Sequence, residues 1–209
     1  NGELDQRILF DNTKAPIVVK KVILDGNGFP KKERVHGRIT GKKVPAIQLK
    51  NHRYEKGGES WEEEATWDDT GHLLSRCDAD GNWTYFEYDR SFISRKVVCS
   101  KKHIIHREFA TYDTAGNLVE LIHDDSSHRD KDNLEGATKK TILKIVPRLK
   151  APCFGEPLSK KYYVWTPEGG EQLKKTENFH RDEKGRLIRH TEKSYDGIKK
   201  ETTFAYDEL

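Results

Sequence analysis

Three short stretches of the sequence carry residues that could act on a substrate or hold a metal. The first is Asp69-Thr70-Gly71, the triplet of aspartic proteases, in which two such loops bring two carboxylates together to share one proton. Only one copy of this triplet occurs in the chain, and the same residue types suit a tight turn. A hydrolase that uses Asp69 is therefore an alternative hypothesis and not the leading one.

Histidines form the other two stretches. His103-Ile-Ile-His106 has the spacing of a zinc pair on a helix, but its neighbours are typical of a strand, where residues i and i+3 point to opposite faces. The polar segment His123-Asp-Asp-Ser-Ser-His128 reads as a solvated loop, with a divalent-cation site or a hydrolase centre as the alternative. From these stretches we predict no metal site, no cofactor and no enzymatic activity.

Four tryptophans offer a different kind of site, a surface that binds carbohydrate or a partner protein. Tryptophan is enriched among the residues that dominate binding energy. Exposed indole rings would therefore indicate an adhesion module, which is our second hypothesis. The residues are Trp61, Trp67, Trp83 and Trp165.

Composition limits the classes of protein to be considered. Lys+Arg 38 against Asp+Glu 35 gives a net charge of +3, and the basic residues are scattered, which argues against a nucleic-acid partner. Hydrophobic residues make up only 33% of the chain, and no apolar run approaches the ~18 residues of a membrane helix, so we predict thin packed layers and no membrane insertion. The three cysteines are too few and too far apart for a disulfide framework or a zinc cluster.

The strongest pattern in the chain is a repeat. Residues 65–76 and 110–121 both read Ala-Thr-aromatic-Asp-x-x-Gly-x-Leu, and a weaker copy starts at Arg181. Asp suits the first position of a type I turn because its carboxylate accepts backbone hydrogen bonds, and Gly suits the fourth position because φ is positive there. Such a turn joins two antiparallel strands through a bulge, with the aromatic residue and the Leu packing across the pair. The repeated residues are Trp67, Asp68, Gly71, Leu73, Tyr112, Asp113, Gly116, Leu118, Asp182, Gly185 and Leu187.

The segments between the turns have the composition of strands. Residues 16–24, 82–88, 95–99 and 201–206 are rich in β-branched and aromatic side chains. We therefore predict an all-β fold of tandem antiparallel β-hairpins that form a curved or spiralling open sheet.

The rhythm of the repeat divides the chain into three regions. Residues 1–123 are hairpins, and residues 171–209 are hairpins that stop at an aromatic-Asp pair with no Gly to follow, so we expect a piece of a longer protein. Residues 124–170 form a charged loop and connector. This region also holds either a strand at 141–146 or a short helix at 136–145.

The repeated aromatic-Asp-x-x-Gly-x-Leu resembles the YD repeat of Rhs and wall-associated proteins. Similar repeats occur in the toxin-encasing component of bacterial Tc toxins and in teneurins. The matching residues span 5–125 and 170–209. The resemblance implies a long β-sheet that spirals into a hollow shell, often around a C-terminal toxin domain, with the repeated residues in a structural role.

This resemblance sets the expected function. The chain is predicted to be a structural, non-enzymatic segment of a large secreted or cell-surface bacterial protein, whose shell encapsulates or presents a toxin or effector domain. Its expected partners are the rest of the full-length repeat protein and an encapsulated toxin domain or a cell-surface glycan or protein. The sequence departs from the regular pattern at 124–170 and lacks the family's self-cleaving aspartyl-protease-like region. We therefore expect an open sheet whose exposed edges permit self-association.

Overall fold

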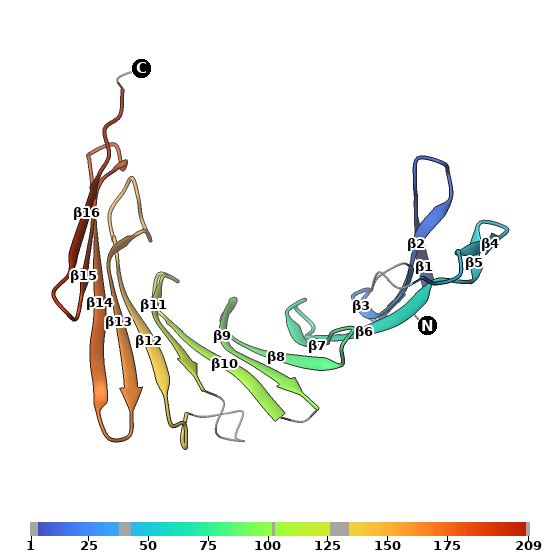
Figure 1. Ribbon diagram of the computed structural model, residues 1–209, viewed down its shortest axis with the longest axis horizontal. Helices are drawn as coiled ribbons and strands as arrows, with labels where there is room; N and C mark the ends of the chain where they lie inside the picture. The colour runs from blue at the N-terminus through green and yellow to red at the C-terminus, as the bar shows by residue number, and fades with distance from the viewer. Residues whose placement is uncertain (1–3, 38–42, 102, 126–133, 208–209) are drawn as a thin grey trace. The chain divides into compact units, whose positions relative to one another are not determined.

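The computed structural model describes residues 4–37, 43–101, 103–125 and 134–207, and this part of the chain is built from strands without a helix (Figure 1). None of its elements is a helix long and apolar enough to cross a membrane. The strands are β1 (Leu4–Phe10), β2 (Pro16–Leu24), β3 (Pro30–Gly37), β4 (Gln48–Lys50), β5 (Arg53–Lys56), β6 (Glu59–Trp67), β7 (Leu73–Cys77), β8 (Asn82–Asp89), β9 (Phe92–Ser100), β10 (His103–Tyr112), β11 (Leu118–Asp124), β12 (Lys140–Pro147), β13 (Pro157–Thr166), β14 (Gly170–Arg181), β15 (Leu187–Ser194) and β16 (Lys199–Thr203).

One long antiparallel sheet contains 14 of these strands. Its order is β1-β2-β3-β6-β7-β8-β9-β10-β11-β12-β13-β14-β15-β16, so each strand pairs with the strand next to it in the sequence. The one exception is the pair β3 and β6, because β4 and β5 between them form a separate two-stranded sheet. Strands β1 and β16 are its two edges, and the sheet is open. The prediction of an all-β fold made of tandem antiparallel hairpins is confirmed.

The strand segments read from the sequence correspond closely to strands of the sheet. Residues 16–24 are β2 itself, and residues 82–88 and 95–99 lie within β8 and β9. Residues 141–146 lie within β12, which pairs with β11 on one side and β13 on the other. The alternative short helix at 136–145 is therefore wrong, because tertiary pairing and the β-branched side chains both favour a strand there. The last predicted strand, 201–206, ends earlier, at Thr203 of β16.

The charged loop that was expected to start at residue 124 starts later. Asp124 is the last residue of β11 and lies opposite Lys140 of β12. Its carboxylate is held 2.5 Å from Nη2 of Arg107, and both side chains are fully buried. A buried carboxylate needs such a partner, and the register of β10 and β11 places Arg107 opposite Asp124. Residues 126–133 of the predicted loop lie outside the described residues.

The chain divides by compactness into two units, residues 1–86 and 87–209. Buried apolar side chains are few in each unit: Val19, Val22 and Ile47 in the first, and Val97, Ala137 and Ile142 in the second. Most strand residues are only half-buried, as the low hydrophobic content predicts. The division into residues 1–123, 124–170 and 171–209 stays a prediction from the sequence pattern. With so thin a core, each hairpin depends strongly on its turn and on its neighbours.

Candidate functional site

The repeated Asp and Gly residues build one recurring turn. In the turns that start at Asp25, Asp68, Asp78, Asp113 and Asp182, the Asp backbone N–H donates to the carbonyl four residues ahead over 2.8–3.0 Å. The Gly three residues ahead donates back to the Asp carbonyl over 3.0–3.2 Å, and its φ is between 80° and 89°. This is a type I turn followed by a left-handed residue.

The Asp carboxylate fixes the turn from inside. Oδ1 of Asp113 accepts the backbone N–H groups of Ala115 and Asn117, both at 2.9 Å. Oδ1 of Asp68 accepts those of Thr70 and His72 at 2.9 and 2.8 Å in the same way. One oxygen therefore holds two backbone donors that the turn would otherwise leave to water.

In four of the five turns the side chain of the residue after the Gly supplies a nitrogen to the Asp carboxylate, which the sequence analysis did not identify. The Asn117 amide donates to Oδ2 of Asp113 over 2.9 Å, and the Arg186 guanidinium donates to Oδ2 of Asp182 over 2.7 Å. Nδ1 of His72 lies 3.0 Å from Oδ2 of Asp68. This position carries a side-chain nitrogen in four of the five turns, as His72, Asn82, Asn117 and Arg186, whereas Phe29 occupies it in the Asp25 turn. The nitrogen shared by those four residues was the available signal.

These hydrogen bonds keep the turn carboxylates ionised. The hydrogen bond from the Thr70 hydroxyl, followed by the backbone N–H of His72, lowers the pKa of Asp68 far below its ordinary value. The Asn117 side chain and backbone N–H groups lower the pKa of Asp113. Burial opposes ionisation of Asp182, but the hydrogen bonds from Arg186 outweigh it and lower the pKa of this carboxyl as well.

Two further turns show what the pattern can and cannot specify. Asp11 forms the same turn with Lys14 in the Gly position at φ 62°, so the carboxylate can impose the turn without Gly. In contrast, the pair Tyr195-Asp196 does not start a turn, because Ser194 takes the first position and Gly197 the fourth. Tyr195 is consequently left 78% exposed.

In the Asp68 and Asp113 turns, the aromatic residue before the Asp contacts the hairpin that precedes it. Tyr112 stacks on Phe92 with ring centroids 4.9 Å apart, and its hydroxyl donates to the Ile93 carbonyl over 3.0 Å. Trp67 likewise stacks on Phe29 at 5.6 Å and donates its indole N–H to the Pro30 carbonyl over 2.8 Å. The motif therefore joins neighbouring hairpins as well as closing its own.

The pair Tyr206-Asp207 continues this contact. The Tyr206 hydroxyl donates to the Leu187 carbonyl 19 residues earlier over 2.9 Å, and the same interval separates Tyr112 from Ile93. The Arg186 guanidinium lies 4.8 Å above the Tyr206 ring.

Leu residues of the repeat complete each hairpin. The register brings Leu73 opposite Trp67 and Leu118 opposite Tyr112, just inside the turn. Leu187 pairs with Arg181 in the weaker copy. A register shift precedes the aromatic or Arg residue in all three pairs, which is the bulge that this turn requires.

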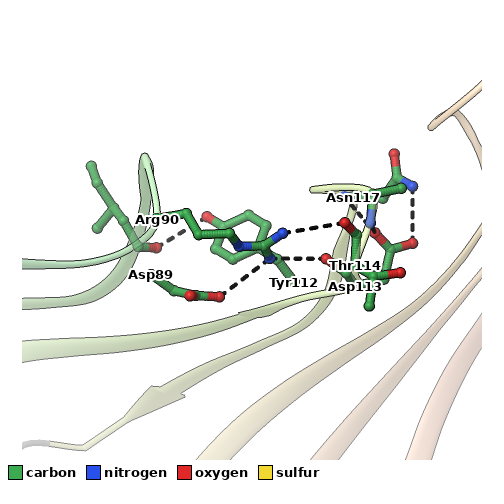
Figure 2. A network of polar contacts seen from close by, with 8 residues as sticks. Asp89, Arg90, Tyr112, Asp113, Thr114 and Asn117 are labelled. Atoms are coloured by element: carbon green, nitrogen blue, oxygen red, sulfur yellow. Dashed lines mark hydrogen bonds and ion pairs between the residues drawn. The ribbon is translucent and has the colours of Figure 1, made fainter.

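Successive loops of the second unit form one row, which we call the turn rim: residues 89–92, 113–117, 148–156 and 182–186. Because the strands alternate in direction, every second connection falls at the same border of the sheet. Figure 2 shows the first link, in which Arg90 donates to the Asp113 carbonyl over 2.9 Å and to the Thr114 carbonyl over 3.3 Å. Further along, the Cys153 thiol donates to the Gly185 carbonyl over 3.1 Å.

The glycines of the turn rim allow this close packing. A Cβ on Gly116 would lie 2.6 Å from Cζ of Phe92, and one on Gly185 would lie 2.4 Å from Sγ of Cys153. These positions therefore need glycine for space as well as for positive φ. In the first unit Gly71 approaches Phe29 in the same way, at 3.0 Å.

The tryptophans proposed as a binding surface are all half-buried. Trp67 is engaged with Phe29 and Pro30, as described above. Trp83 lies 6.1 Å from the Tyr85 ring, and Trp165 lies beneath the Lys140 ammonium at 4.1 Å. Trp61 pairs with Val35 across β6 and β3. Their role as binding aromatics stays a prediction.

A concave pocket of about 360 Å³ lies on the first unit, beside Trp67. Charged side chains of both signs line it, including Lys20, Glu33, Glu63 and Arg76. Several of these form cross-strand ion pairs, Lys20 with Glu33 and Arg76 with Glu63, both at 2.5 Å. Asp69 itself is exposed in the neighbouring turn, where its carboxylate accepts a long hydrogen bond of 3.4 Å from the Asn27 amide.

The two histidine stretches contribute one residue each to a common cluster. His106 of β10 and His123 of β11 both lie close to Glu108, which the sequence analysis did not identify. His123 is the last residue but one of β11, so it belongs to a strand and not to the expected loop. His103 is exposed on β10 outside the cluster, and His128 lies outside the described residues.

Comparison with known proteins gives a fold relationship. No protein-family model matches the chain, and no curated protein matches it. The chain is similar in structure to a Tc toxin complex, seen in the crystal structure of TcdB2-TccC3-Cdc42, with a TM-score of 0.65 and 16% sequence identity over 97% of this chain. It covers only 10% of that chain, and at this identity the likeness shows the fold alone.

Two other solved structures have low TM-scores and carry no weight. A protein of unknown function from Bacteroides fragilis gives 0.32 with 15% identity, over 68% of this chain and 90% of that one. A porin-like protein from Bacteroides uniformis gives 0.30 with 8% identity, over 95% and 92%.

The glycine packing can be tested with two alanine variants in the second unit. Gly116→Ala should lower the free energy of unfolding by about 2–4 kcal/mol, because it combines a left-handed alanine with a clash against Phe92. Gly197→Ala is the matched control, since its φ of 87° is equivalent but its Cβ would meet nothing within 4 Å, and should cost about 1 kcal/mol. Urea unfolding measures both. Equal losses would refute the role of the close approach.

The contact between hairpins can be tested at Tyr112. Tyr112→Phe keeps the ring stacked on Phe92 but removes the hydrogen bond to Ile93, and should destabilise by about 1 kcal/mol. Tyr195→Phe, at an exposed tyrosine, should leave the thermal midpoint unchanged. The interpretation fails if the two variants melt alike.

The turn carboxylates predict a dependence of stability on pH. The pKa values of Asp68 and Asp113 are lower in the folded chain than in the unfolded one, so the contribution of these two carboxylates is complete above the unfolded value of about 4 and is lost as the pH falls below it. Asp113→Asn cannot titrate, and its unfolding free energy should decrease less steeply than that of the wild type below about pH 4. Urea unfolding across this range measures the difference, and an unchanged slope would contradict the assignment.

Proposed function

We propose that this chain is a structural, non-enzymatic segment of a YD-repeat shell that encapsulates or presents a toxin or effector domain. The observation that carries the proposal is the use of the repeated residues. Asp113 and Gly116 close a turn, Leu118 pairs across it, and Tyr112 holds the preceding hairpin. Each of these residues fixes the backbone or packs against a neighbouring strand, which is the role that we expect of residues in the sheet of a shell.

The fold relationship supports this function. The similar solved structure contains a Tc toxin component, and this chain aligns along almost all of its length with about a tenth of that chain. A segment of that proportion fits a piece of a much longer sheet. Few side chains in either unit are buried, which suits a wall one sheet thick.

The partners and location follow from the same proposal. The partners are the rest of the repeat protein and an enclosed toxin or effector domain. The protein would be secreted or displayed on a bacterial cell surface. The exposed position of Asp69 and its long hydrogen bond to Asn27 are consistent with a turn residue.

Protease protection in the native full-length protein tests the proposal. In the wild type, the segment downstream of this chain should resist a protease that cleaves it readily after denaturation. Gly116→Val should expose that segment, because a β-branched residue at positive φ opens the wall. Gly197→Ala should retain the protection.

Electron microscopy of the same preparation gives an independent readout. An enclosed space bounded by the sheet of this chain is expected. A native protein in which the sheet bounds no space and the downstream segment is cleaved at the denatured rate would overturn the proposal. Hydrolytic activity that disappears in Asp69→Asn would overturn its non-enzymatic part.

A further inference from the structure

A cluster of two histidines and a glutamate lies on one face of the second unit. Glu108 of β10 is directly opposite His123 of β11, and His106 precedes Glu108 by two residues, so strand periodicity brings all three to the same face. A register irregularity lies immediately before His106, between Ile104 and His106. Bulges of this kind are frequent beside functional sites, where they redirect a side chain.

The distances within the cluster fit a shared cation. Nε2 of His106 lies 2.5 Å from Oε1 of Glu108, and Nδ1 of His123 lies 3.9 Å from the same oxygen. One ligand atom from each of the three side chains lies within 4.8 Å of the others. Ligands of a tetrahedral zinc ion, at about 2.0–2.2 Å from the metal, are about 3.3 Å apart. Small side-chain rotations therefore suffice to form the site.

The ligand chemistry and accessibility are suitable. Imidazole nitrogen and carboxylate oxygen are ligands of zinc and of the neighbouring divalent transition metals. The three side chains are between 25% and 38% exposed, so an ion can enter.

We propose that His106, Glu108 and His123 form a binding site for one divalent transition-metal ion of the zinc class, which joins β10 to β11. Three protein ligands leave a fourth position for water. The sequence alone could not reveal the site, because its residues come together only through the register of two strands. The proposal is independent of the shell function.

Lys96 provides a specific feature of this site. Its ammonium lies 3.3 Å from Oε1 of Glu108, from the strand on the other side of β10. A bound cation must compete with this charge for the carboxylate. Neutralising Lys96 should therefore strengthen metal binding, whereas loss of a ligand should weaken it.

Zinc titration of the chelator-treated chain tests the site, with Zn²⁺ alone as the probe and calorimetry as the readout. The wild type should bind one ion. His106→Ala, Glu108→Gln and His123→Ala should each weaken binding by more than about tenfold. Lys96→Gln should strengthen it severalfold. His103→Ala removes an exposed histidine from the same strand and is the matched control, expected to bind as the wild type does.

A second readout separates ligand loss from misfolding. Saturating Zn²⁺ should raise the thermal midpoint of the wild type and of His103→Ala, but not that of His106→Ala, with unliganded midpoints of all three measured alongside. Bound Co²⁺ should give a ligand-field spectrum free of thiolate charge transfer. The proposal is overturned if the wild type binds no ion, if the ligand variants bind with unchanged affinity, or if alkylation of the cysteines abolishes binding.

Discussion

The interaction on which the rest of the structure depends is the pair of hydrogen bonds that one aspartate oxygen accepts within a turn. The chain has little apolar material, and its units bury few large side chains. A protein with a larger hydrophobic core would obtain its stability from that core. Here the stability must come from many local hydrogen-bonded turns. A carboxylate that accepts hydrogen bonds from two backbone N–H groups closes a turn of five residues, and so short a loop costs little entropy to close.

The turn also determines how hairpins associate. The bulge that accompanies each turn aligns the preceding aromatic residue with the Leu beyond the Gly, and the same ring then reaches the hairpin before it. Sequence spacing, register and inter-hairpin contact are thus consequences of one local geometry. That dependence explains why aromatic, Asp, Gly and Leu recur together while the residues between them vary.

Much of this fold could be predicted from the sequence, because its determinants are local. The turn at Asp113, the strand at 16–24 and the antiparallel hairpins follow from residues close together in the chain. Contacts between hairpins could not be predicted, since Arg90 reaches Asp113 only once the strand order is known. Glu108 lies opposite His123 because of the register between β10 and β11, and the residues close to either one in the sequence do not determine that register. The turn at Asp11 was not predicted for another reason. Its fourth position is Lys14, and the carboxylate of Asp11 holds this residue in a conformation that intrinsic propensity assigns to glycine.

The turn rim makes the loops of one border of the second unit depend on one another. Along it, loops contact one another from Arg90 to Gly185, so an added residue would displace the next loop as well as its own. Insertion or deletion within one rim loop should therefore be felt by the loop beside it, which ties the lengths of successive connections on this border to one another.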